Sequence, residues 1–117
     1  MNRRVERLNQ FLRQELSQLL MRGLNDPRIP QLVTVTRVET SVDLRYARVH
    51  ISVMGTSEEK AIAVATLQAA AGFLQRELRP RLKLRYVPSL TFRLDDSIEE
   101  GARMLQAIQE LPAAREP

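Results

Sequence analysis

An α+β fold in a single domain is the structure that this sequence predicts. Apolar residues recur every three or four positions in some segments and every second position in others, which are the spacings of helices and strands. The chain has 117 residues, a length that suits one domain. Its 44% of hydrophobic and 27% of charged residues are typical of a folded globular protein. We therefore expect a three-stranded sheet and helices, in the order helix, strand, strand, helix, kink, helix, strand, helix.

A long amphipathic helix is predicted near the N-terminus. Apolar side chains recur there at helical steps, at Val5, Leu8, Leu12, Leu16, Leu19 and Leu20. We expect the helix to end before Asp26-Pro27, because a residue that precedes proline is disfavoured in a helix and Gly23 offers a C-terminal cap. Residues 26–31, with two prolines, predict a connecting loop.

Two strands of a hairpin are predicted next. Residues 32–41 are rich in valine and threonine, and their alternation slips at Arg37-Val38, which indicates a bulge or a strand end. Apolar residues then alternate cleanly with more polar ones at Ala47, Val49, Ile51 and Val53. The short connection at residues 42–45 makes the two strands a hairpin.

A second helix is predicted to begin at Thr56, which forms a capping-box pattern with Glu59. We expect a kink at Ala70, Ala71 and Gly72, where small residues follow one another. Glycine costs a helix interior about 1 kcal/mol relative to alanine, so Gly72 indicates a kink or a close approach by another backbone. The helix then continues to Arg79 and ends at Pro80.

A third strand and a last helix complete the prediction. Leu90, Phe92 and Leu94 alternate with polar residues, and Ser97 with Glu100 forms a second capping-box pattern. The helix that it opens would place Ile98, Leu105 and Ile108 on one side. We expect residues 1–111 to form the domain and residues 112–117 to be a disordered tail.

Basic residues are concentrated in one part of the chain. The formal net charge is +4, and all basic residues except Lys60 and Lys83 are arginine, which can bind phosphate with two hydrogen bonds. Between residues 73 and 94 the single acid Glu77 is outnumbered by Arg76, Arg79, Arg81, Lys83, Arg85 and Arg93. This band predicts a polyanionic partner, although an ordinary solvated surface is an equally good interpretation of charge alone. At residues 69–72 the small side chains would let a nucleic-acid backbone come close, or would pack a helix tightly on the sheet.

Catalytic, metal and cofactor sites are not predicted. We interpret His50 as a surface histidine, because no cysteine and no nearby carboxylate accompanies it in the sequence. Asp95-Asp96 is interpreted as a pair that favours the start of the last helix. No phosphate-binding glycine loop is present, and the absence of cysteine is compatible with a cytosolic location. The longest weakly polar stretch, residues 61–74, is too short to cross a membrane.

Several motifs occur together in a recognisable order. They are Leu24-Asn25-Asp26-Pro27-Arg28, then Val33 to Glu39 with Ser41 and Asp43-Leu44, then Ala70 to Leu74, and finally Leu84 to Phe92 with Asp95 or Asp96, Ser97, Glu100 and Gly101. In this order the chain resembles the bacterial ribosome-binding factor A family from Arg4 to Ile108. The resemblance implies a KH-like domain of type II, with the order α-β-β-α-kink-α-β and an additional C-terminal helix. An Ala-x-Gly kink then stands where other KH domains carry a GXXG loop.

The resemblance also implies a function. A member of this family would bind free 30S small subunits late in assembly, assist maturation and end processing of 16S rRNA, and support growth in the cold. We expect a monomeric cytoplasmic protein that is not an enzyme, needs no cofactor and meets no membrane. The residues expected to contact RNA are Arg28, Arg45, Arg76, Arg79, Arg81, Lys83 and Arg85. Two alternatives stay open, a general KH-like RNA chaperone without ribosomal preference and an adaptor whose basic band meets an acidic protein.

Overall fold

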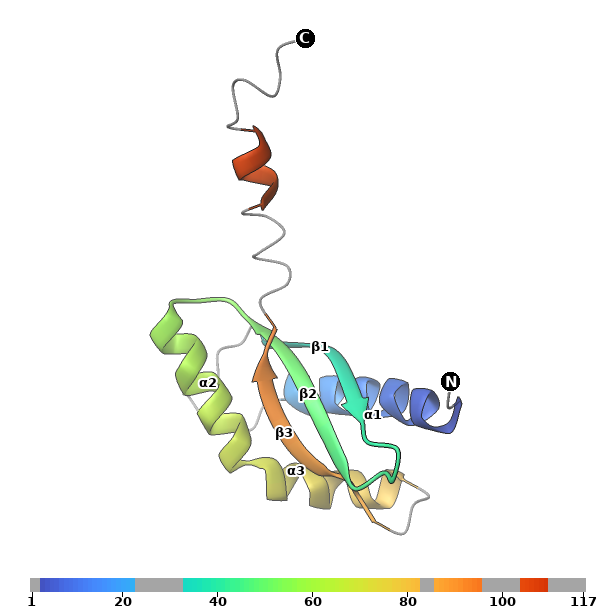
Figure 1. Ribbon diagram of the computed structural model, residues 1–117. Coiled ribbons are helices and arrows are strands. Elements are labelled where there is room, and N and C mark those ends of the chain that lie inside the picture. The colour runs from blue at the N-terminus through green and yellow to red at the C-terminus, as the bar shows by residue number, and fades with distance from the viewer. Residues whose placement is uncertain (1–2, 23–32, 83–85, 96–103, 110–117) are drawn as a thin grey trace.

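The computed structural model describes residues 3–22, 33–82, 86–95 and 104–109. Its elements are α1 (Arg3–Met21), β1 (Val33–Thr40), β2 (Tyr46–Val53), α2 (Ser57–Ala69), α3 (Ala71–Leu78), the short 3₁₀ helix η1 (Arg79–Arg81) and β3 (Ser89–Leu94) (Figure 1). This order confirms the predicted succession of helices and strands. Residues 104–109 are helical and exposed, whereas the predicted capping residues Ser97 and Glu100 lie outside the described residues.

The three strands form one sheet in the order β1-β2-β3 (Figure 1). β1 and β2 are the predicted antiparallel hairpin, and Val38 lies opposite Val49. β3 runs parallel to β2, with Phe92 opposite Val49. A parallel neighbour requires a crossover connection, and the α2–α3 segment supplies it.

A bulge interrupts the hairpin where the sequence alternation slips. The pairing register shifts between Val35 and Arg37, so Thr36 is the extra residue. The shift leaves Val35 and Val38 both buried, although they are three positions apart. The predicted bulge is therefore confirmed one residue earlier than Arg37-Val38.

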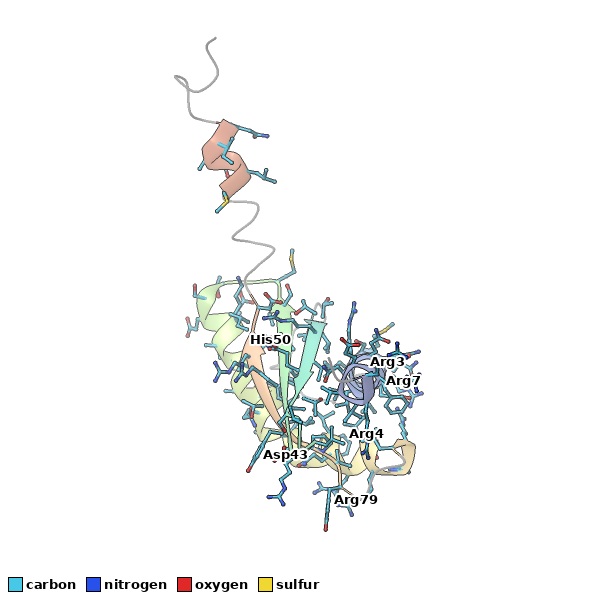
Figure 2. The ribbon with its side chains drawn as sticks, turned by 45° about the vertical axis from the view of Figure 1, so that its right-hand side comes forward. Arg3, Arg4, Arg7, Asp43, His50 and Arg79 are labelled. Atoms are coloured by element: carbon cyan, nitrogen blue, oxygen red, sulfur yellow. The ribbon has the colours of Figure 1, made fainter. Side chains whose placement is uncertain are left out.

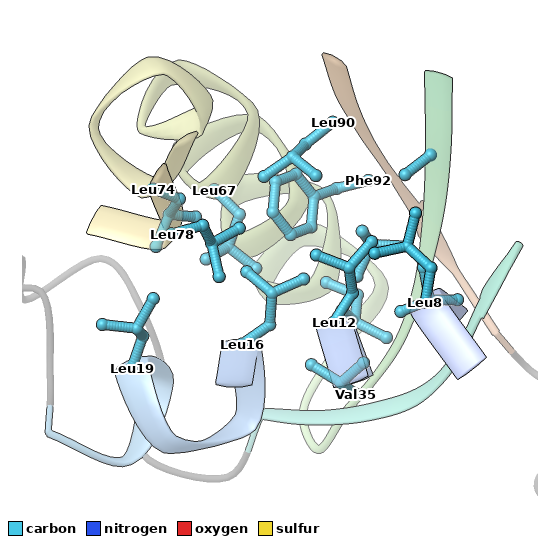
Figure 3. Close-up of a cluster of buried hydrophobic side chains, with 14 of the residues drawn as sticks. Leu8, Leu12, Leu16, Leu19, Val35, Leu67, Leu74, Leu78, Leu90 and Phe92 are labelled. Atoms are coloured by element: carbon cyan, nitrogen blue, oxygen red, sulfur yellow. The ribbon is translucent and has the colours of Figure 1, made fainter. Parts of the chain in front are cut away.

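The hydrophobic core lies between one face of the sheet and the helices (Figure 3). The alternating residues predicted to face inward on β2 are all buried, and so are Leu90 and Phe92 on β3. Helix α1 contributes the leucines of its apolar stripe, and α2 and α3 contribute Leu67, Leu74 and Leu78. None of the helices that the structure describes is long and apolar enough to cross a membrane.

Amide side chains attach the helices to both edges of the sheet. Asn9 of α1 accepts a hydrogen bond from the Thr40 backbone N–H at 2.9 Å. On the opposite edge, Gln68 of α2 donates to the Leu90 carbonyl at 3.0 Å and accepts from the Phe92 N–H at 2.9 Å. Gln75 of α3 donates to the Pro88 carbonyl at 3.0 Å. These bonds use backbone groups that an edge strand would otherwise leave unpaired.

The interruption between α2 and α3 lies at Ala70. Its φ and ψ of −87° and 2° leave the helical region, while its N–H still bonds to the Thr66 and Leu67 carbonyls. Gly72 follows in the first turn of α3, and its φ is not positive. A Cβ atom at Gly72 would meet nothing nearer than Arg76 Nη1 at 3.8 Å. The kink therefore does not depend on glycine at position 72, contrary to our expectation, and the close-approach interpretation of Gly72 remains.

Candidate nucleic-acid interface

Arginines from three distant segments gather at one end of the molecule, which we call the basic end. It comprises the N-terminal half of α1, the hairpin connection at residues 41–45 and η1. Arg4 and Arg7 line the same depression as Leu44 and Arg81. Figure 2 shows Arg4 and Arg79 on the same side of the domain. The basic end is thus defined by Arg4, Arg7, Arg45, Arg79 and Arg81.

The exposed face of α3 continues this positive surface toward the α2–α3 junction. Arg76 and Arg79 are exposed, and Arg76 reaches back over Gly72, one turn earlier on the helix. Phe73 beside it is 45% exposed. A glycine, an exposed aromatic ring and a guanidinium group therefore lie together, and this combination suits a nucleic-acid backbone and its bases.

Arg81 has a structural role that the sequence did not indicate. Its Nη1 donates to Glu15 Oε2 at 2.9 Å, and the two side chains are only 28% and 19% exposed. This ion pair joins η1 to α1. Reversal of the charge at Arg81 would therefore disturb the fold as well as the surface potential.

The hairpin connection is held by a hydrogen-bonded turn. Asp43 Oδ1 accepts from the Ser41 hydroxyl at 2.6 Å and from the Arg45 N–H at 3.1 Å. These two hydrogen bonds, that from Ser41 first, lower the pKa of Asp43 below its usual range. Leu44 adopts a φ of 64°, a left-handed conformation that is rare for leucine. The turn thus fixes both Leu44 and Arg45 at the basic end.

Four of the seven predicted RNA-binding residues can be placed. Arg45, Arg79 and Arg81 lie at the basic end, and Arg76 lies at the α2–α3 junction. Arg28, Lys83 and Arg85 lie outside the described residues.

Sequence reasoning missed Arg4 and Arg7 on α1. The two arginines stand three positions apart beside the apolar stripe of a helix, so their position on a common side was visible in the sequence. The residues that surround them in the folded protein could not be recognised from the sequence. Only the folded chain brings them to Leu44 and Arg81.

His50 is buried, which corrects the interpretation of a surface histidine. It is 8% exposed, and its Nε2 lies 2.6 Å from Glu39 Oε1. Glu39 is eleven positions earlier, and the hairpin brings it beside His50. The hydrogen bond with His50 lowers the pKa of Glu39, and the Arg37 guanidinium acts in the same direction. The contact between His50 and Glu39 lies on the polar face of the sheet.

Another polar contact lies at the end of β3. Asp95 Oδ2 accepts a hydrogen bond from the Thr36 hydroxyl at 2.6 Å, and Asp96 lies outside the described residues. Among the residues that the structure describes, no three histidine, aspartate or glutamate side chains lie close enough together to hold a metal ion.

Comparison with known proteins identifies a family. The family model for ribosome-binding factor A matches residues 4–108. The ribosome-binding factor A of Acetivibrio thermocellus is 44% identical over 110 residues, which are 94% of this chain and 89% of the relative. That of Dictyoglomus thermophilum is 44% identical over 111 residues, which are 95% of this chain and 92% of the relative.

Solved structures have the same architecture. The crystal structure of ribosome-binding factor A from Thermus thermophilus superimposes with a TM-score of 0.66 at 28% identity, covering 77% of this chain and 94% of that one. A homology model of the Thermus thermophilus factor, fitted into a cryo-EM map of its complex with the 30S subunit, superimposes with a TM-score of 0.60 at 28% identity. It covers 74% of this chain and 89% of that one. The fold of this chain is therefore KH-like, as predicted.

Proposed function

Because this chain belongs to the ribosome-binding factor A family, we propose that it binds free small ribosomal subunits through 16S rRNA and assists the late maturation of that RNA. The observation that carries the proposal is the family match over residues 4–108. A Thermus thermophilus relative of the same fold, fitted into a map of a complex with the 30S subunit, supports the same partner.

The charge distribution supplies a physical basis for RNA binding. Phosphate contacts provide a large share of the affinity of proteins for nucleic acids, and arginine binds phosphate with two parallel hydrogen bonds. In our proposal the arginines of the basic end bind the RNA backbone, together with Arg76 at the α2–α3 junction. Arg28, Lys83 and Arg85 remain proposed contacts. Arg81 contributes by holding η1 against α1 through Glu15.

We further propose that the protein acts in the cytoplasm as a monomer and by binding, without catalysis. A protein that stabilises one arrangement of RNA acts only while bound, and its influence is limited by its differential affinity for the competing arrangements. The requirement should be greater in the cold, where wrongly paired RNA rearranges slowly. End processing of 16S rRNA would then be carried out by other factors on the bound subunit.

Sedimentation with purified ribosomal particles tests the partner. We expect the protein to sediment with free small subunits and to stay in the supernatant with large subunits and whole ribosomes. Retention at raised salt would distinguish specific binding from general RNA binding, which salt weakens strongly. Equal binding to small subunits and bulk RNA would support a general RNA chaperone. A partner that survives nuclease treatment would support a protein adaptor.

Complementation tests the cellular role. Cells that lack the protein should accumulate small subunits with unprocessed 16S rRNA ends, more strongly in the cold. A folded His50→Asn variant should restore maturation, because binding without catalysis needs no proton transfer at His50. Normal subunit binding with failed maturation in that variant would instead indicate a chemical role for the histidine.

A further inference from the structure

A shallow pocket lies at the basic end, between α1, the hairpin connection and η1. Its volume is about 370 Å³. Three arginines contribute to its lining, Arg4, Arg7 and Arg81, and its apolar part includes Phe11, Leu44 and Leu82. Among the described residues no acidic side chain lines it, although Glu15 pairs with Arg81 at 2.9 Å. The pocket therefore combines an apolar surface and an aromatic ring with a rim of arginines.

This combination suits a ligand with a flat apolar part and an attached anion. A nucleotide has both features, because its base stacks on aromatic and aliphatic side chains and its phosphate pairs with arginine. The volume lies near the lower limit of pockets that enclose small molecules, roughly 300–1,000 Å³. Such a space admits one nucleotide and excludes a double helix.

We propose that this pocket binds a single unpaired nucleotide of the RNA. The base contacts Phe11 and Leu44, and the adjoining phosphate is bound by Arg4 and Arg7, which stand one turn apart on α1. This assignment rests on the proposed function, because it presupposes an RNA partner. It adds a base-contacting site that is separate from the α2–α3 junction, where KH domains clamp the RNA backbone.

Two features hold the walls of the pocket in place before any ligand binds. The ion pair with Glu15, at 2.9 Å, restrains the Arg81 side chain. The turn around Asp43 restrains Leu44 in its left-handed conformation, with φ at 64°. Unfavourable backbone conformations persist where the surroundings impose them, and they are frequent at binding sites. A preformed wall reduces the entropy lost when a nucleotide binds.

Two substitutions separate the contact with the base from the contact with the phosphate. Phe11→Leu removes the ring but keeps an apolar side chain, and Arg7→Gln removes one exposed charge of the rim. Arg13→Gln is the matched control, because Arg13 is an exposed arginine of the same helix outside the pocket. The affinity of each full-length variant for purified small subunits is measured over a range of salt concentrations, with thermal melting as a check of folding.

We expect Phe11→Leu and Arg7→Gln each to weaken binding at least about fivefold. Arg7→Gln should also reduce the slope of affinity against salt by about one, because one phosphate contact is lost. Phe11→Leu should leave that slope unchanged, and Arg13→Gln should bind within about twofold of the parent. Ultraviolet cross-linking of the parent complex should attach an RNA base to a peptide that contains Phe11 or Leu44.

Results that contradict the pocket assignment can be distinguished from results that contradict the proposed function. If Phe11→Leu melts and binds like the parent protein, no base occupies the pocket. Should Phe11→Leu not fold, parent-like binding and salt slope in Arg7→Gln would overturn the assignment, since Arg7 is exposed and its loss leaves the core intact. If the parent itself does not bind small subunits, the proposed function and the pocket assignment both fall.

Discussion

The α2–α3 junction and the basic end are both exposed and both carry arginine, but the chain builds them in different ways. The junction is continuous in sequence, and its small residues and Arg76 were recognisable before the structure. The basic end joins segments far apart in the chain, and its ion pair links residues 66 positions apart. A site formed by one continuous segment can be recognised from the composition of that segment. An assembled site depends on which faces the core brings together.

Charge reversal at the basic end should have the largest effect on binding. The double variant Arg7→Glu and Arg79→Glu replaces two exposed arginines from different segments. We expect its affinity for small subunits to fall at least about a hundredfold at low salt, because two attractions become repulsions. Thermal melting should change little. Arg13→Glu with Arg22→Glu is the control, and an equal loss of affinity in that control would mean that net charge alone matters.

Removal of the Gln68 amide tests how the end of α2, just before the α2–α3 junction, is attached to β3. Gln68→Met loses both hydrogen bonds to β3, and we expect the free energy of unfolding to fall by about 1–2 kcal/mol. Urea unfolding measures this change. Gln18→Met, an exposed glutamine of α1, should change stability by less than about 0.5 kcal/mol. Equal stability of the two variants would show that water replaces the amide at the sheet edge without cost.

The ion pair between Arg81 and Glu15 should contribute less to the free energy of unfolding than the hydrogen bonds of Gln68. A double-mutant cycle with Arg81→Gln and Glu15→Gln should give a coupling energy of about 1 kcal/mol, because the two side chains are only partly removed from water. The free energies of unfolding of the four proteins supply this value. Additive effects would show that α1 and η1 are held together by their apolar contacts alone.

Gly72→Ala should have the smallest effect on stability, with the opposite sign. Gly72 occupies a helical turn with room for a Cβ atom, so alanine should raise the free energy of unfolding by about 0.5 kcal/mol. If an RNA backbone approaches this position closely, the same variant should bind small subunits more weakly despite its greater stability. A destabilised variant would mean that the junction does depend on glycine.

Local signals predicted most of the secondary structure. The capping box at Thr56 and Glu59 forms with both hydrogen bonds, at 3.0 and 3.1 Å. The leucine stripe of α1 and the alternation on β2 and β3 correctly identified the core. These features depend on the spacing of residues along a few turns or one strand, so they are visible without knowledge of the partner element.

The prediction that Gly72 holds the kink was wrong, because the local sequence pattern at this position has two interpretations. Glycine within a helical pattern indicates either a distorted backbone or a close approach from outside, and the sequence cannot separate the two. The structure places the distortion at Ala70, an ordinary residue whose φ and ψ lie outside the helical region. The break therefore falls at an alanine, and Gly72 does not impose it.

The sequence by itself determined the order of the elements, the apolar face of each, and the resemblance to one family through motifs that span the chain. Only the tertiary structure decided which polar and charged groups meet. It paired His50 with Glu39 and Arg81 with Glu15, and it brought Arg4 and Arg7 of α1 to the same pocket as Arg81. The physical reason is that apolar periodicity depends on the local geometry of the chain. A polar contact depends on the register of the hairpin and on the docking of helices, which the whole core determines together.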